Sequence, residues 1–407
     1  MRGAGDHLSV GDRIAFYRRR RGLTQRVLAD LVGRSEDWLS KVERNERDVR
    51  RLDVVRDLAR ALRVSVGDLL GQPVLVEDTQ PRNDDVPAVR DALMSHRRLS
   101  QTLFGSRATA SVEVGPVERI TSHAWTDYQQ GRLGRVIAAL PNLIKSAQAL
   151  EETSRPNDRR PWIASSRIHH LAATTLSKLG EADLAWIAAE RAMSAAEQSA
   201  EPLSLASAAR AGTHALLAVG RFDDAVNLGQ TAADWLTEQM SQDDPAALSI
   251  VGMLHLRTAI AAARRQDRST TTELLSAADR AASRLGRDAD YWNTSFGPTN
   301  VQLHRVAASL DLGDVAWVIE HGSRVDASHL PPERGVTHQV DLARAYSYVA
   351  RDDEALNQLL DAEAAAPQIV RHSAAVRDTV KSLHRRARHN AGQTPLLGLA
   401  ERCRAIQ

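Results

Sequence analysis

The chain has 407 residues, a length typical of two or three domains. Hydrophobic residues make up 43% of it but aromatic residues only 4%, and the abundant alanine and leucine favour helix over strand. The net charge of +2 excludes a strongly basic or acidic protein as a whole, but residues 1–71 hold 16 Lys and Arg against 11 Asp and Glu, so we expect only this part to meet a polyanion.

A single cysteine, Cys403, excludes a disulfide within the chain and a cysteine metal cluster. The first residues, "MRGAGDHLSV", lack the apolar core of a signal peptide. No apolar run approaches the ~18 residues that a membrane span needs. We therefore expect a soluble, cytoplasmic protein without a membrane segment.

Residues 8–71 have the periodicity of five short helices. The first begins around Ile14 and ends at "RRRRG". The second, "LTQRVLADLVG", has Thr24 as its N-cap and stops at Gly33. Its expected core face consists of Leu28, Leu31 and Val32.

The third helix follows the turn "VGRS", with Ser35 as its N-cap and Leu39 and Val42 facing the core. A fourth helix, "LDVVRDLARALR", and a last turn, "SVGDLLG", complete the group. Two short helices joined by such a turn are the helix-turn-helix arrangement.

The stretch "LTQRVLADLVGRSEDWLSKVER" resembles the XRE-type (Cro/repressor-like) helix-turn-helix family over about 60 residues. The residues that match are Thr24, Gln25, Leu28, Ala29, Gly33, Ser35, Leu39, Ser40 and Glu43. Arg34 and Asn45 depart from the family pattern, although Asn45 tolerates a left-handed conformation. The resemblance implies that Gln25 bonds the DNA backbone and that the third helix lies in the major groove.

The third helix has one polar face. Asp37, Ser40, Lys41 and Arg44 stand at i, i+3, i+4 and i+7, opposite Leu39 and Val42. Lys41 and Arg44 can donate to guanine or to phosphates. This pattern favours a working DNA reader over a copy that has lost its function. The candidate DNA-binding residues are Gln25, Arg34, Ser35, Glu36, Asp37, Ser40, Lys41, Arg44, Arg47 and Arg50.

The acidic start of this helix, Glu36-Asp37, has two interpretations. Both carboxylates can stabilise the positive end of the helix dipole. Either can instead accept a hydrogen bond from cytosine in the major groove.

After Gly71 the helical period breaks. We expect a helix-turn-helix domain over residues 1–72, a linker over 73–86, and a helical repeat domain over 87–407. The linker prediction depends on "QPVLVEDTQPRNDDVP", which contains three prolines and several acidic residues.

The C-terminal part repeats a turn followed by a helix with small residues. Alanines stand five and twelve residues after Gly180, after Gly220 and after Ala350. This pattern resembles the tetratricopeptide (TPR) repeat, with about six helix pairs spaced by 39 to 49 residues. The expected fold class is all-α: a five-helix helix-turn-helix bundle followed by a TPR-like solenoid, whose stacked pairs leave a concave surface.

The TPR pattern places polar side chains on that concave surface. They are Arg167, His170, Thr174, Lys178, Arg210, His214, Arg344 and Ser347. The basic groove that they form resembles grooves that clamp a peptide carboxylate. The alternative is a solvated helix face with scattered arginines.

Residues 286–304, "GRDADYWNTSFGPTNVQLH", interrupt the repeats with aromatic and amide side chains. The segment resembles one in actinobacterial regulators that join an XRE-type head to a TPR body. It either lines a ligand pocket or packs between unequal repeats. The candidate ligand-binding residues here are Trp292, Phe296, Asn300 and His304, with Tyr291 beside them.

Fourteen histidines invite a search for metal and catalytic motifs. His169 and His170 are adjacent and so point to different helix faces, and no HExxH, GxSxG or phosphate-binding loop occurs. We expect no metal, no cofactor and no enzymatic activity.

The sequence thus predicts a transcriptional regulator. It would bind double-stranded DNA as a homodimer on a palindromic operator, under the control of a peptide or small-molecule effector bound by the repeats. The rival hypothesis is an interaction scaffold, whose TPR-like repeats capture a protein and whose helix-turn-helix is an accessory docking module.

Overall fold

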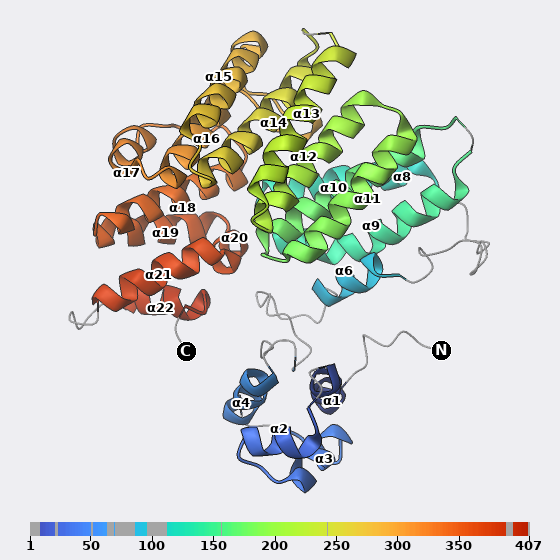
Figure 1. Cartoon of the computed structure of the whole chain (residues 1–407), viewed down its shortest axis with the longest axis vertical. Coiled ribbons are helices and arrows are strands. Elements are labelled where there is room, and N and C mark those ends of the chain that lie inside the picture. The colour runs from blue at the N-terminus through green and yellow to red at the C-terminus, as the bar shows by residue number, and fades with distance from the viewer. Residues whose placement is uncertain are drawn as a thin grey trace. The chain divides into compact units, whose positions relative to one another are not determined.

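The computed structural model describes residues 9–20, 23–49, 52–62, 69, 86–95, 112–155, 157–241, 243–387 and 394–405. The chain forms two compact units, Met1–Met94 and Ser95–Gln407, which we call the head and the body. The described residues form helices and no strand apart from one isolated bridge between Ala289 and Phe296. The all-α fold class is confirmed (Figure 1).

The head contains five helices among its described residues: α1 (Val10–Arg20), α2 (Gln25–Leu31), α3 (Glu36–Glu43), α4 (Leu52–Leu62) and α6 (Val86–Leu93). The predicted caps of α2 and α3 are confirmed, because the side chains of Thr24 and Ser35 accept hydrogen bonds from the backbone N–H of Val27 and Trp38. The turn between them passes through Gly33 at φ +63°.

Ile14, Leu28, Leu39 and Leu58 are fully buried in the core of the head. The prediction for Leu31 is wrong, because its side chain is 61% exposed. The last turn of α2 presents Ala29 and Val32 to this core instead. Of the predicted fifth helix, "SVGDLLG", only the buried Leu69 is among the described residues.

The body is an array of paired helices. It consists of α8 (Val114–Gln129), α9 (Leu133–Thr153), α10 (Arg160–Lys178), α11 (Ala182–Ser199), α12 (Pro202–Ala218), α13 (Phe222–Gln239), α14 (Pro245–Arg264), α15 (Arg268–Leu285), η2 (Tyr291–Asn293), α16 (Pro298–Asp311), α17 (Val315–Trp317), η3 (Val318–Gly322), α18 (Pro332–Tyr348), α19 (Asp352–Ala365), α20 (Pro367–His372), α21 (Ala374–Ala387) and α22 (Thr394–Arg402). Each pair packs on the next, and the layers are visible in Figure 1.

The turn inside each pair has a recurring backbone. Gly131, Gly180, Gly220 and Gly313 all have φ between +73° and +86°, and Gln266 and Ala350 take the same left-handed place at +64° and +58°. The alanines predicted at offsets five and twelve from Gly180, Gly220 and Ala350 are buried between the paired helices. Small side chains let those helices approach closely.

The first helix of each pair contacts the first helix of the next, in the order α8, α10, α12, α14, α16 and α18. The array also curls, because α8 contacts α18 and α9 contacts α20. Gly131 and Gly134 permit this approach, since a Cβ on either would stand 2.6 Å from an atom of Ala366 or Gln368. The first helices therefore surround the interior of the body.

Helix α14 corrects one expectation. Its 20 residues are long and apolar enough to cross a membrane, although the sequence was expected to contain no such run. However, 78% of its apolar window is buried inside the body. It is the only such helix among the described residues, and its apolar side chains form the core between α13, α15 and α16.

Candidate functional site

The outer face of α3 is the first candidate site. Leu39 and Val42 are buried, whereas the side chains of Asp37 and Arg44 are 70% and 58% exposed. Lys41 Nζ lies 2.7 Å from Asp37 Oδ2 one helical turn away. Because exposed ion pairs of this kind contribute at most about 1 kcal/mol, Lys41 can leave Asp37 for a phosphate at little cost.

The remaining candidates on this side surround the turn. Ser35 and the acidic residues Glu36 and Asp37 occupy the start of α3, where Ser35 caps the helix. The Arg34 guanidinium lies 5.6 Å from the centre of the Trp38 ring. Arg47 is exposed, and Arg50 lies outside the described residues.

A buried ion pair supports this face from behind. Glu43 accepts two hydrogen bonds from Arg18, of 2.6 and 2.8 Å, and Gln25 Nε2 donates a third to it at 2.8 Å. Arg18 also donates to the Leu23 carbonyl, at 2.8 Å. Donating hydrogen bonds to the Glu43 carboxylate raises the pKa of Arg18. These contacts join α1, α2 and α3 at one point, so they fix the angle of α3.

Sequence reasoning missed Arg18, which lies in the run "RRRR". The signal was Glu43, which stands four residues after Leu39 and therefore on the buried side of α3. A carboxylate on a core face needs a cationic partner.

The second candidate site is a small cavity inside the body. Its volume is about 20 Å³, and its lining consists of Trp125, Tyr128, His170, Thr174, Arg210, His214, Arg257, Asn293 and Arg334. The repeat pattern had placed His170, Thr174, Arg210 and His214 on the concave surface, and the structure brings these four together. They reach the cavity from α10 and α12, and the other lining residues come from α8, α14, η2 and α18.

Three arginines give this cavity its charge. Burial, with Arg334 and Arg257 nearby, lowers the pKa of Arg210 to about 9. Burial and the charge of Arg334 lower the pKa of Arg257 to about 10. Both guanidinium groups therefore stay protonated at neutral pH, close to one another and to Arg334.

The histidines around the cavity carry no compensating charge. Burial, together with the nearby arginines, holds the pKa values of His170, His214 and His304 well below 6.5. They are neutral at pH 7. The ring of His170 meets the Trp125 ring edge-on, with centroids 5.2 Å apart, and its Nδ1 bonds the Ser207 hydroxyl.

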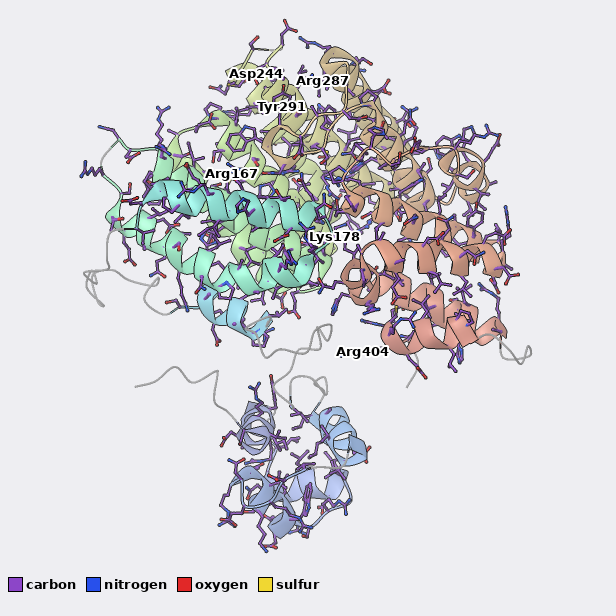
Figure 2. The ribbon with its side chains drawn as sticks, turned by 180° about the vertical axis from the view of Figure 1, so that it is seen from behind. Arg167, Lys178, Asp244, Arg287, Tyr291 and Arg404 are labelled. Atoms are coloured by element: carbon purple, nitrogen blue, oxygen red, sulfur yellow. The ribbon has the colours of Figure 1, made fainter. Side chains whose placement is uncertain are left out.

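Residues 287–297, which we call the inner loop, cover the cavity. Arg210 donates to the carbonyls of Trp292 and Asn293 at 3.4 and 3.5 Å, and Arg334 to that of Thr294 at 3.3 Å. Arg167 on α10, labelled in Figure 2, reaches Asn293 Oδ1 at 3.3 Å and lies 6.0 Å from the centre of the Trp292 ring. Backbone carbonyls of the loop thus accept hydrogen bonds from Arg210 and Arg334.

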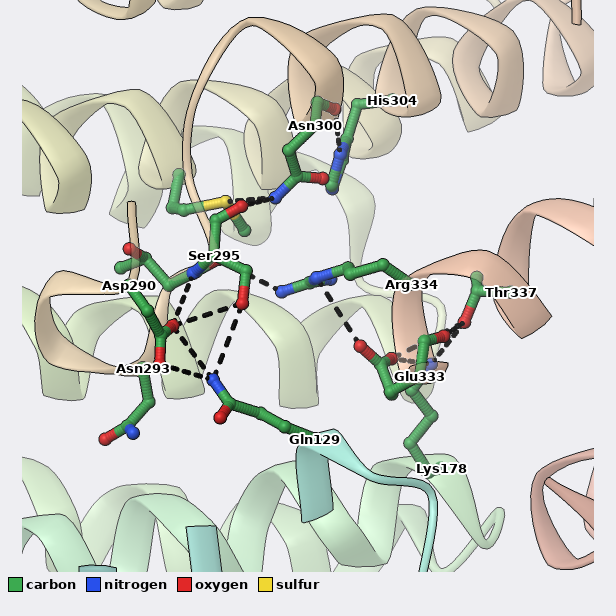
Figure 3. A network of polar contacts seen from close by, with 12 residues as sticks. Gln129, Lys178, Asp290, Asn293, Ser295, Asn300, His304, Glu333, Arg334 and Thr337 are labelled. Atoms are coloured by element: carbon green, nitrogen blue, oxygen red, sulfur yellow. Dashed lines mark hydrogen bonds and ion pairs between the residues drawn. The ribbon is translucent and has the colours of Figure 1, made fainter. Parts of the chain in front are cut away.

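The loop is also tied down from α8. Gln129 Nε2 donates to both Asp290 carboxylate oxygens at 2.8 Å, and the Ser295 N–H donates to the same carboxylate at 2.8 Å (Figure 3). Asn300 donates to the Ser295 carbonyl, and His304 Nδ1 bonds the Asn300 carbonyl. Asn300 and His304 therefore position the loop.

Phe296 belongs to the core and not to a pocket. Its side chain is fully buried, and a Cβ on Gly252 would stand 2.0 Å from its Cζ atom. Of the two interpretations of residues 286–304, packing between the repeats is the one that applies to Phe296. Tyr291 lies at the start of η2, where its carbonyl accepts from Thr294 Oγ1 at 2.7 Å.

Lys178 and Arg344 are occupied by carboxylates. Lys178 Nζ lies 2.5 Å from Glu333 Oε1 and donates to Thr337, which joins α10 to α18. Burial raises the pKa of Glu333, but Lys178 and Arg334 together hold it well below its ordinary value. Arg344 pairs with Asp341 at 3.0 Å and Asp311 at 3.3 Å, and it does not line the cavity.

Sequence reasoning missed Trp125, Tyr128, Arg257 and Arg334. Trp125 precedes the turn residue Gly131 by six positions, as His214 precedes Gly220, so the repeat phase could have found it. Arg257 stands nine residues before Gln266, close to the offset of Arg210 from Gly220. Gln266 and Gly131 belong to repeats whose sequence pattern is weak, so the pattern did not assign positions to their helices.

A larger hollow of about 390 Å³ lies between α19, α21 and α22. Its two arginines are already paired, because Arg386 lies 2.7 Å from Asp352 and Arg351 lies 2.7 Å from Glu354. The arginines of this hollow are therefore not free to bind an anion.

Comparison with known proteins assigns the head. Residues 9–70 match a family model described as "Helix-turn-helix domain". With α2, the Gly33 turn and α3 in place, this part of the chain is a helix-turn-helix domain, a class of domain in which the second helix enters the major groove of DNA.

No match was found among curated proteins. Among solved structures, PlcR of Bacillus thuringiensis, determined in complex with the peptide PapR7 and DNA, has 10% sequence identity to this chain over 97% of this chain and 93% of that one. The TM-score is 0.27, which is too low to define a common fold.

Proposed function

We propose that this protein is a sequence-specific, DNA-binding transcriptional regulator of the XRE type. The observation that carries the proposal is the outer face of α3, where Ser40, Lys41 and Arg44 are presented together beside the exposed Arg34 and Arg47. The Arg18–Glu43 pair holds this helix against α1 and α2. A helix in this position inserts into the major groove, where lysine and arginine read guanine.

The body supplies the regulation in this proposal. Its buried, positively charged cavity binds an effector, either a peptide or a small metabolite, and the bound state changes the arrangement of two heads in a homodimer. Two heads on a palindromic operator would read half-sites about 34 Å apart, or a multiple of that distance. A differential affinity of about 1–3 kcal/mol between the two arrangements is enough for control.

The test is selection of genomic fragments by the purified full-length protein at near-physiological salt. Wild type should enrich a palindromic sequence, and a Lys41→Ala/Arg44→Ala variant should not. Arg324→Ala is the matched control, because Arg324 is an exposed arginine of the body, and it should enrich the same sequence as wild type.

Selection of unrelated fragments by wild type, or equal enrichment by the double variant, would remove α3 from the role of reader. Capture of a protein with no preference among DNA fragments would favour the scaffold hypothesis.

A further inference from the structure

The cavity of the body holds more positive charge than its surroundings neutralise. Glu333 is the buried carboxylate beside the arginines, and Lys178 already pairs with it at 2.5 Å, while Arg334 Nε lies 3.4 Å away. Within the described residues, Arg257 makes no hydrogen bond or ion pair. The cavity therefore has unmatched cationic groups directed at one small volume.

Arg210 is only weakly satisfied. Its side chain is 6% exposed, and its two bonds to loop carbonyls, at 3.4 and 3.5 Å, are longer than the 2.7–3.2 Å of a good N–H···O bond. Its buried Nε has no hydrogen-bond partner. Burying a guanidinium without an anionic partner is costly, so binding of an anion here would be strongly favoured.

The inner loop that supplies those carbonyls is strained. Trp292, Asn293 and Ser295 have φ of +54°, +55° and +48°, the left-handed region that residues other than glycine rarely adopt. Such conformations persist only where surrounding contacts hold them. Here the contacts include long bonds from Arg167, Arg210 and Arg334 to neutral oxygens.

A ligand group that fits this place is anionic and compact. With the loop closed, about 20 Å³ remains, which is room for about one water molecule. A carboxylate that replaced the Trp292 and Asn293 carbonyls could accept paired bonds from arginine. The edges of the Trp125 and neutral His170 rings beside it suit an apolar substituent.

We propose that this cavity binds the carboxylate group of the effector, and that the inner loop is an internal substitute which that carboxylate displaces. This proposal rests on the function proposed above, in which the body binds an effector. The carboxylate can come from a free organic acid or from the C-terminus of a peptide, and both make the same contacts with the arginines.

The experiment uses the full-length protein with four probes at constant ionic strength. These are benzoate, the dipeptide Ala-Phe, its C-terminal amide, and inorganic phosphate, each compared with sodium chloride. Thermal unfolding reports binding, and hydrogen exchange of the amides of Ala289, Thr294 and Ser295 reports the loop, because these N–H groups are bonded within it.

We expect a carboxylate at about 100 times its Kd to raise the melting temperature by about 4 °C. The loop amides should exchange about tenfold faster than in chloride, although the protein as a whole becomes more stable. A response to benzoate but not to Ala-Phe would identify a free organic acid as the source of the carboxylate. A response to Ala-Phe but not to benzoate would identify a peptide C-terminus. The amide should have no effect.

Arg257→Met is the decisive variant. It removes an unmatched charge that lines the cavity and keeps most of the volume, so it should melt at a higher temperature than wild type in chloride and lose the response to carboxylates. Arg210→Gln is the second variant, and it too should lose the response. Arg324→Gln, an exposed arginine elsewhere in the body, should keep it.

Three results would overturn the proposal: no response of wild type to either carboxylate, a larger response to phosphate, or a response that survives Arg257→Met and Arg210→Gln. None of these measurements involves DNA. A protein that responds to carboxylates but enriches no operator would contradict the proposed function alone, and the reverse outcome would contradict the carboxylate site alone.

Discussion

At the scale of single residues, the head depends on one charge inside its core. Glu43 is 8% exposed and holds Arg18 and Gln25 together. Removal of one partner leaves the other charge buried and unpaired, which costs about 3–5 kcal/mol in comparable proteins. The exposed pair of Lys41 with Asp37 is about as short as the Arg18–Glu43 pair, but it contributes little to the free energy of unfolding.

In the Glu43→Ala variant the head should therefore unfold at a markedly lower denaturant concentration. Its free energy of unfolding should fall by about 3 kcal/mol or more. Asp37→Asn, which breaks the exposed pair, should change that free energy by less than about 1 kcal/mol. Chemical denaturation followed by circular dichroism measures both. Equal losses from the two substitutions would show that the Arg18–Glu43 pair is not what holds α3.

At the scale of elements, the turns show what a sequence can predict. The caps at Thr24 and Ser35 and the turn at Gly33 are local chemistry, and the structure confirms them. The prediction for Leu31 failed because the buried face of α2 is centred on Leu28, Ala29 and Val32, and Leu31 lies to one side of that face. The arginine cavity joins residues from α8 to α18, so no local pattern contains it; it follows only when the array curls.

The turns also predict a pair of opposite substitutions. Ala350 has φ +58° where Gly180 and Gly220 hold the equivalent place. Ala350→Gly should stabilise the body by up to about 1 kcal/mol. It removes the left-handed strain of alanine, which costs about 1–2 kcal/mol, and this gain exceeds the entropy cost of glycine.

Gly180→Ala should destabilise the body by about 1 kcal/mol through the same conformational penalty. A Cβ there meets no atom within 4 Å, so packing does not contribute. Thermal unfolding of the two variants beside wild type gives the comparison. Shifts of the same sign would contradict the equivalence of the two turns.

At the scale of the whole molecule, the body encloses neutral histidines beside protonated arginines. Burial lowers the pKa values of His170, His214 and His304 below 6.5, so the folded protein binds these protons less readily than the unfolded chain does. The unfolded chain gains protons as the pH falls through about 6.5. Stability that is present above that pH is therefore lost below it.

We expect the free energy of unfolding to fall by about 1.4 kcal/mol per pH unit for each such histidine, between about pH 6.5 and pH 5. His214→Gln should reduce the slope, and His123→Gln, at an exposed position, should leave it as in wild type. Denaturant titrations at a series of pH values measure it. A stability independent of pH over this interval would place these histidines in contact with solvent.

The central claim is that α3 reads DNA with Lys41 and Arg44. The most direct measurement is the affinity of the full-length protein for its selected operator over a series of salt concentrations, for wild type, Lys41→Ala and Arg44→Ala. Loss of a base contact should cost about 1–3 kcal/mol at one base position, and loss of a phosphate contact should lower the salt slope by about one. An affinity and a slope that neither substitution changes would contradict the claim.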